Sequence, residues 1–201
     1  MISVGGVRPF TTRVDGLTGA SQGFPDHYTK TFDGLAGVYQ EEIPSPIRGG
    51  NAAGDLAYEV FSTARAQLPG ALTVGTSVLR ASTIGSEFAM TRGHIHQIVD
   101  RAEIYFGLSG QGVMLLESLS GEVATLEVLP GSLVYVPGGW IHRSVNVGSE
   151  PLVSLFCFSA DAGQDYEIVE QAGGMRKLVV TDEQGGWMLV DNPRYRPRAS
   201  L

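Results

Sequence analysis

The sequence predicts an all-β protein in which short strands build a sandwich or barrel. Short segments rich in Val, Leu, Tyr and Phe recur about every ten residues from residue 71 onward, the spacing typical of such folds. Glycine or proline separates them, for example at Gly110, Gly121 and Pro130. Two histidines in this region, His94 and His96, lie two positions apart. Side chains alternate between the faces of a strand, so both imidazoles are predicted to point into the barrel.

Ten segments are expected to form strands, and each is bounded by turn residues. In chain order they are residues 73–79, 87–90, 102–108, 112–117, 123–128, 133–136, 142–147, 152–158, 177–181 and 187–190. The last two are expected to form a closing hairpin. Residues 58–66 are instead predicted to be helical, and the whole chain is expected to contain few short helices.

The chain divides into three parts on composition. Residues 1–50 are rich in Gly, Thr and Pro and are expected to form an N-terminal arm that packs on the barrel or on a partner subunit. Proline and glycine near residues 44–50 mark a break before the main domain, which is predicted over residues 51–193. Residues 194–201 are predicted to be a solvent-exposed C-terminal tail.

Composition narrows the class of protein. A chain of 201 residues with 43% hydrophobic and 17% charged residues is typical of one soluble globular domain. Its formal net charge of −7 argues against a nucleic-acid or anionic-membrane partner, and it requires a local positive site for any anionic substrate. The single cysteine, Cys157, excludes an internal disulfide. No signal peptide or membrane span is recognisable, so a cytoplasmic location is expected.

Three of the four histidines gather in one constellation with a carboxylate. His94 and His96 precede Glu103, and His142 follows a Pro-Gly turn further along the chain. Three imidazoles and one carboxylate suit a divalent first-row metal with coordination positions left for a substrate. Two alternatives remain at this point: His142 as an ordinary core histidine, and Asp100 as the ligand in place of Glu103.

These residues lie in recognisable motifs. The run Gly131…Pro137-x-Gly139-x-x-His142-x-x-x-Asn146 resembles the second motif of the cupin superfamily, and His94-x-His96…Glu103…Gly110 resembles the first. Six residues separate His96 from Glu103, a spacing similar to that of the cupin-type, or archaeal-type, glucose-6-phosphate isomerases. Also similar to that family are the blocks at residues 91–96, 100–105, 110–117, 134–137, 142–146 and 161–166.

The resemblance implies a double-stranded β-helix, the cupin jelly roll, and a homodimeric metalloenzyme of glycolysis and gluconeogenesis. The implied reaction interconverts glucose 6-phosphate and fructose 6-phosphate. The implied ligands of one divalent ion per subunit are His94, His96, Glu103 and His142; iron(II) is expected, with manganese, zinc and nickel as alternatives. Phosphate contacts are implied for Thr76, Ser77, Arg92, Gly93 and Tyr105, a place in the sugar site for Tyr166, and catalytic roles for Glu103 and Tyr166.

Two positions depart from the pattern expected of the family. Phe158 stands where relatives often have tyrosine, and Gln164 where some have histidine. The chemistry allows two routes, a proton shuttle through Glu103 or a direct hydride shift, and the sequence does not choose between them. A metal-dependent dioxygenase, a related sugar-phosphate isomerase or epimerase, and a ligand sensor without turnover are the competing functions, since one fold hosts many chemistries.

Overall fold

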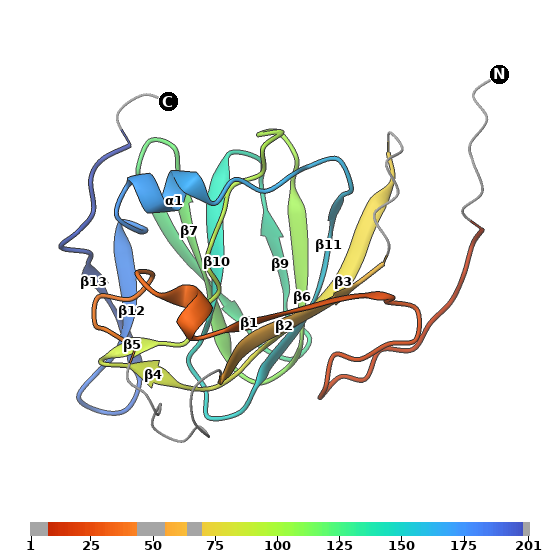
Figure 1. Cartoon of the computed structure of the whole chain (residues 1–201), viewed down its shortest axis with the longest axis horizontal. Helices are drawn as coiled ribbons and strands as arrows, with labels where there is room; N and C mark the ends of the chain where they lie inside the picture. Colours follow the sequence, from red (N-terminus) through yellow and green to blue (C-terminus); the bar gives the residue numbers. More distant parts are fainter. Residues whose placement is uncertain (1–7, 44–54, 64–69, 199–201) are drawn as a thin grey trace.

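The computed structural model describes residues 8–43, 55–63 and 70–198. Antiparallel strands are the main regular secondary structure of these residues (Figure 1). The first nine strands are β1 (Asp26–Thr31), β2 (Leu56–Ser62), β3 (Leu72–Leu79), β4 (Thr83–Ile84), β5 (Glu87–Phe88), β6 (Glu103–Ser109), β7 (Gly112–Ser118), β8 (Val123–Val128) and β9 (Leu133–Val136). They are followed by β10 (Trp140–Asn146), β11 (Leu152–Ser159), the helix α1 (Glu167–Gln171), β12 (Lys177–Thr181) and β13 (Trp187–Asp191).

The central strands form the two sheets of a jelly roll. One sheet contains the order β3-β11-β6-β9 and is extended beyond β3 by β2 and β1. The other contains β10-β7-β8, and the segment between Met90 and His94 joins it through isolated bridges to β10. The chain passes back and forth between the two sheets in the order of a double Greek key, which is the jelly-roll topology. The predicted all-β jelly roll is therefore confirmed.

Most predicted strands agree with the structure to within two residues at either end. Three agree at both ends, namely β8, β9 and β12. The segment predicted over residues 87–90 is shorter than expected, because only Glu87 and Phe88 pair as β5, in a third sheet of order β13-β12-β5-β4. The closing hairpin of β12 and β13 is present, with Lys177 opposite Asp191.

The helix predicted over residues 58–66 is wrong where the structure describes it. Residues 58–62 belong to β2, and residues 64–66 lie outside the described residues. β2 pairs with β1 on one side and with β3 on the other. Two ladders of backbone hydrogen bonds outweigh the weak helical preference of this stretch, and its aromatic and β-branched residues fit a sheet.

The N-terminal region packs against the barrel from β1 onward. β1 adds to the sheet through β2, and the short turn of 3₁₀ helix at Asp33–Leu35 brings Phe32, Leu35 and Tyr39 into the hydrophobic core. At the other end of the chain, the expected exposed tail is only partly exposed. Pro193 and Pro197 face solvent, whereas the side chain of Arg198 is buried against Glu117.

Within the described ranges, no helix is both long and apolar enough to cross a membrane. α1 spans five residues and is the one α-helix of the described chain. It lies near the ends of β7 and β10, close to the C-terminal segment, whose Arg196 N donates to the carbonyl of Ala172 just after the helix (Figure 1).

Candidate metal centre and substrate pocket

Strand pairing brings the two halves of the histidine set together. His94 and His142 exchange both backbone hydrogen bonds, from His94 N to His142 O at 3.1 Å and from His142 N to His94 O at 2.9 Å. His96 follows two positions after His94 and so keeps to the same side of the extended segment. Glu103 begins β6 on the facing sheet. Backbone hydrogen bonding, rather than closeness in sequence, thus sets the distances between these side chains.

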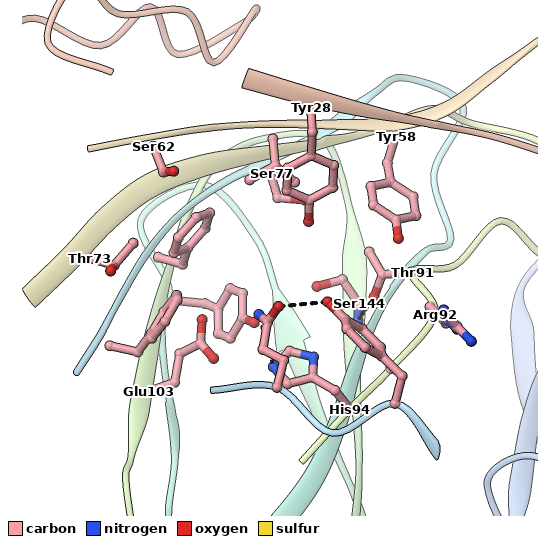
Figure 2. A pocket seen from close by; sticks show the side chains of 17 residues that line it. Tyr28, Tyr58, Ser62, Thr73, Ser77, Thr91, Arg92, His94, Glu103 and Ser144 are labelled. Atoms are coloured by element: carbon pink, nitrogen blue, oxygen red, sulfur yellow. Dashed lines mark hydrogen bonds between the residues drawn. The ribbon is translucent and has the colours of Figure 1, made fainter. Parts of the chain in front are cut away.

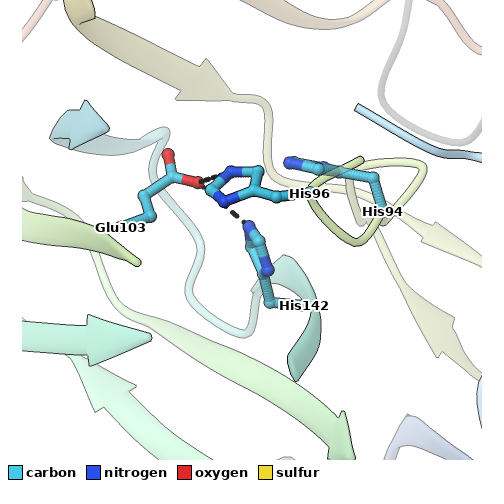
Figure 3. A group of neighbouring side chains, drawn as sticks. All are labelled: His94, His96, Glu103 and His142. Atoms are coloured by element: carbon cyan, nitrogen blue, oxygen red, sulfur yellow. Dashed lines mark hydrogen bonds and ion pairs between the residues drawn. The ribbon is translucent and has the colours of Figure 1, made fainter. Parts of the chain in front are cut away.

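The four side chains converge on one point (Figure 3). One nitrogen or oxygen from each of His94, His96, Glu103 and His142 lies within 4.8 Å of all the others. Glu103 Oε2 is 3.1 Å from His142 Nε2 and 3.2 Å from His96 Nε2. A carboxylate oxygen and two imidazole lone pairs this close repel one another unless a positive charge, either a proton or a metal ion, lies among them.

The outer nitrogens of two imidazoles are already occupied. His96 Nδ1 donates to the carbonyl of Arg101 at 2.8 Å, and His142 Nδ1 donates to the carbonyl of Trp140 at 3.1 Å. A neutral imidazole that donates from Nδ1 presents its Nε2 lone pair as a ligand. His96 Nε2 is buried and forms no hydrogen bond within the described residues. The donor set and this buried lone pair fit a divalent metal ion.

The electrostatics hold two of the candidate ligands, His94 and Glu103, in their metal-binding protonation states. Burial alone would lower the pKa of His96, but its contacts with Glu103 and with the Arg101 carbonyl outweigh burial and raise that pKa. Burial, reinforced by the neighbouring His142, holds the pKa of His94 well below its ordinary value. Burial alone would raise the pKa of Glu103, but the adjacent His142 and His96 outweigh it and bring that pKa to about 2. A neutral imidazole and an ionised carboxylate are the forms that bind metals.

Asp100, the alternative carboxylate, lies outside the cluster. Its side chain is 78% exposed and pairs with Arg101 at 2.9 Å. Arg101 also pairs with Asp161 at 2.9 Å, so the loop between His96 and Glu103 is held at the surface by ion pairs. Glu103 is therefore the carboxylate that lies among the three imidazoles.

A pocket opens above the cluster, and hydroxyl groups are its commonest polar lining (Figure 2). Tyr28 and Tyr58 direct their hydroxyls into it from one side, while Glu103 and His94 form the opposite side. The residues that line it are Tyr28, Tyr58, Val60, Ser62, Thr73, Ser77, Thr91, Arg92, Gly93, His94, Glu103, Tyr105, Ser144, Phe156, Phe158, Gln164 and Tyr166.

Most residues expected to contact substrate line this pocket. They are Ser77, Arg92, Gly93, Tyr105 and Tyr166. Thr76 does not line it, because neighbouring residues of β3 point to opposite faces. Its hydroxyl instead donates to the carbonyl of Gly19 at 2.5 Å on the outer face of the sheet.

Several lining residues were not expected from the sequence, among them the polar residues Tyr28, Tyr58, Ser62, Thr73 and Ser144. Tyr28 and Tyr58 come from β1 and β2, in a region without a recognisable motif. Ser144 follows His142 by two positions on β10. That same-face spacing was a readable signal for Ser144, whereas no such signal pointed to Tyr28.

Contacts at the mouth of the pocket join Gln164, one of the two departing positions, to Tyr166 and His94. Tyr166 Oη donates to Gln164 Oε1 at 2.6 Å, and Gln164 Nε2 lies 3.4 Å from His94 Nε2. The guanidinium of Arg92 lies over the Tyr166 ring, 5.1 Å from its centroid, and forms an ion pair with Glu170 of α1. A cation–π contact and an ion pair thus tie α1 to the rim of the pocket.

The chain is similar to glucose-6-phosphate isomerases over most of its length. A family model described as glucose-6-phosphate isomerase matches residues 29–196. A glucose-6-phosphate isomerase of Sinorhizobium medicae is 44% identical over 190 residues, which cover 94% of this chain and 89% of that protein. One of Thermococcus gammatolerans is 38% identical over 188 residues, or 94% and 97% of the two chains. Among solved structures, an oxalate oxidase overlaps 58% of each chain at 20% identity, with a TM-score of 0.45.

Proposed function

Because the chain belongs to the glucose-6-phosphate isomerase family, we propose that it is a metal-dependent enzyme that interconverts glucose 6-phosphate and fructose 6-phosphate. One observation carries the proposal beyond the family: the cluster of three imidazoles and one carboxylate opens directly into a pocket rich in hydroxyl donors. A polyhydroxylated phosphate ester matches such a lining, because each hydroxyl or phosphate oxygen finds a hydrogen-bonding partner.

His94, His96, Glu103 and His142 would hold one divalent ion, and we propose iron(II), with manganese, zinc or nickel as alternatives. When bound, such an ion supplies Lewis acidity to the carbonyl and hydroxyl oxygens that exchange roles in the reaction. Three neutral imidazoles and one carboxylate leave a net positive charge at the site. That charge suits an anionic substrate in a chain whose own net charge is −7.

Glu103 is the group that we assign to proton transfer between carbons 1 and 2. Its carboxylate lines the pocket wall as well as belonging to the cluster. We assign Tyr166 to the sugar end of the pocket, where its hydroxyl is oriented by Gln164. A direct hydride shift would need no such base. Incorporation of solvent deuterium at carbon 2 therefore supports the role of Glu103, and its complete absence supports the hydride shift.

The phosphate group is assigned to the region of Ser77 and the turn from Thr91 to Gly93. These residues contribute hydroxyls and a backbone amide, and Arg92 adds a cation. Tyr105 lies deeper, with its ring centroid 6.1 Å from that of His142, and is assigned to the sugar rather than to the phosphate.

We further propose that the enzyme is a cytoplasmic homodimer. Support comes from exposed apolar residues on the outer side of β6 and β9, where Phe106 lies opposite Leu133 and Tyr135 is also exposed. Exposed clusters of this kind are typical of protein–protein interfaces. Light scattering on the purified protein measures the mass directly, and a monomer at micromolar concentration would contradict this part of the proposal.

The activity is tested by adding fructose 6-phosphate and following glucose 6-phosphate with a coupled dehydrogenase. Turnover is expected without oxygen uptake, and it should disappear after chelation and in His94→Ala. His27→Ala is the matched control, because His27 lies outside the cluster and pairs with Glu59 at a 44%-exposed position. Oxygen consumption would favour the dioxygenase, and unchanged turnover in metal-free protein would overturn the proposal.

A further inference from the structure

We propose that Arg143 is a positioning residue that makes the pocket selective for ligands with an anionic group, acting through the peptide between Arg92 and Gly93. The inference rests on the proposed phosphate-bearing substrate. Arg143 lies between His142 and Ser144 on β10. Ser144 lines the pocket, Arg143 does not, and side-chain alternation along the strand directs Arg143 away from it. It therefore touches no ligand in the pocket.

Arg143 is a buried cation with few partners. The residue is 3% exposed. Its Nη2 donates to the carbonyl of Arg92, its Nη1 lies 2.9 Å from the sulfur of Met90, and its Nε is buried without a partner among the described residues. A thioether is a weak acceptor, so the Arg92 carbonyl is the one strong acceptor among these contacts.

No ion pair of the described chain includes Arg143. The groups that act on it electrostatically are Tyr39, Tyr58 and Glu87, of which only Glu87 carries a carboxyl group. Glu87 accepts instead from the backbone of Gln40, at 2.5 Å. Arg92, the other cation near the pocket, already forms an ion pair with Glu170. Glu87 is the one carboxylate that faces Arg143, and it does so from beyond ion-pair distance, with its Oε2 buried and unpartnered among the described residues. Because a buried charge without a close partner is costly, we infer that a bound anion supplies a further counter-charge.

The effect of this charge reaches the pocket through one peptide unit. The Arg92 carbonyl and the Gly93 N–H belong to the same trans peptide and point in opposite directions. Since the guanidinium binds the carbonyl, the N–H points away from it, and Gly93 lines the pocket. This N–H takes part in no backbone–backbone hydrogen bond of the described residues. Polarisation of the carbonyl makes such an amide a stronger donor to an anion.

Glycine at position 93 keeps the guanidinium close to the pocket surface. A Cβ built on Gly93 would lie 3.0 Å from Arg143 Nε and 3.3 Å from Nη2. The backbone there has a φ of 79°, which side chains other than glycine's rarely adopt. Both the close approach and the left-handed conformation favour glycine at this position. Because glycine has no side chain, only backbone lies between the buried cation and the pocket.

The test compares an anionic and an uncharged ligand on metal-loaded protein. Calorimetry measures the binding of inorganic phosphate and of glucitol, an uncharged six-carbon polyol, to the wild type, Arg143→Met and Arg143→Lys. Arg143→Met should weaken phosphate binding by on the order of tenfold, as expected for the loss of one nearby charge in a partly buried site. Glucitol binding should change less than about twofold, since no charge is involved. Arg143→Lys keeps the charge and should restore most of the phosphate affinity.

Equal losses for phosphate and glucitol in Arg143→Met would show a purely structural role and overturn the inference. If Arg143→Met fails to fold, Arg143→Lys alone decides, because loss of phosphate binding with retained glucitol binding and metal content would contradict a role for the charge. Wild-type protein that binds phosphate but does not isomerise sugar phosphates would contradict the proposed function and leave this inference standing. Wild-type protein that binds no phosphate would overturn the inference.

Discussion

Replacement of Arg198 by methionine should destabilise the protein more than any substitution at an exposed charge. Arg198 forms an ion pair with Glu117 in which the two side chains are 3% and 1% exposed. Glu117 also accepts from Tyr195 Oη and from the backbone N–H of Arg176, both at 2.8 Å. Arg198→Met preserves most of the apolar volume, removes the cation, and leaves a buried carboxylate with two of its three donors.

The expected cost follows from this geometry. Removing one partner of a buried ion pair destabilises a protein by about 3–5 kcal/mol, because the remaining charge stays desolvated. The variant also loses the bonds from Arg198 to the carbonyls of Ile168 and Gly174, at 3.3 and 3.0 Å, which tie the C-terminal segment to α1 and to the turn after it. At about 2–4 °C per kcal/mol for a chain of this size, the midpoint of thermal unfolding should fall by about 6–20 °C.

Urea unfolding followed by tryptophan fluorescence measures the free energy, since Trp140 and Trp187 lie on separate sheets. Arg80→Met is the matched control, because the Arg80–Glu59 pair has a 45%-exposed arginine and should cost less than about 1 kcal/mol. The double variant Glu117→Met/Arg198→Met should recover part of the loss, since no unpaired charge remains. A cost for Arg198→Met equal to that of Arg80→Met would refute the view that this pair is buried in solution.

Three further predictions concern the site and its surroundings. Chelation should lower the unfolding midpoint, and added metal should restore it, because an ion at a thousandfold its dissociation constant stabilises the folded state by about 4 kcal/mol; a midpoint unaffected by metal would count against the site. Glu170→Gln should free Arg92 and tighten inorganic phosphate binding by about two- to threefold in calorimetry, and no change would place Arg92 away from the anion. Burial raises the pKa of Glu87 above 4.5, so the folded state binds more protons than the unfolded state between 4.5 and the raised pKa, and stability should fall as pH rises through that window. Glu87→Gln should flatten this part of the stability profile, and an unchanged slope would assign it to other groups.

The fold was predictable where periodicity and turn residues agreed. Residues 123–128 and 133–136 are bounded by Gly121, Pro130 and Gly131, and the strands β8 and β9 begin and end as expected. Gly121 and Gly131 adopt positive φ values of 85° and 87°, so these glycines occupy turn conformations that specify where the neighbouring strands stop. Local sequence suffices for such elements.

The elements that were missed depend on distant partners. β2 has residues that fit either a strand or a weak helix, and its pairing with both β1 and β3 decides in favour of the strand. The burial of Arg198 depends on Glu117, which lies far away in the sequence. Neither relation can be read from a single sequence, because both arise only after the chain has folded back on itself.

The candidate site likewise contains residues that local sequence predicts and residues that only the folded chain brings there. His94 and His96 share a face by simple alternation, and the motif around His142 points to the same centre. The alternation rule also shows why Thr76 and Ser77 cannot both face the pocket, although the resemblance to the family implied contacts for both. Tyr28 was not predictable, since it reaches the pocket from β1, a strand that the sequence pattern did not predict.

The reciprocal backbone contact between His94 and His142 has a consequence for how this protein can tolerate change. Distance between the two imidazoles depends on main-chain atoms at those positions and not on the length of the polypeptide that connects them. Extra residues grafted into an intervening surface bend, such as the one at Ser120 and Gly121, should leave the ligand geometry untouched. A shift by a single position in how the two segments align would turn the imidazoles to opposite faces and dismantle the centre at once.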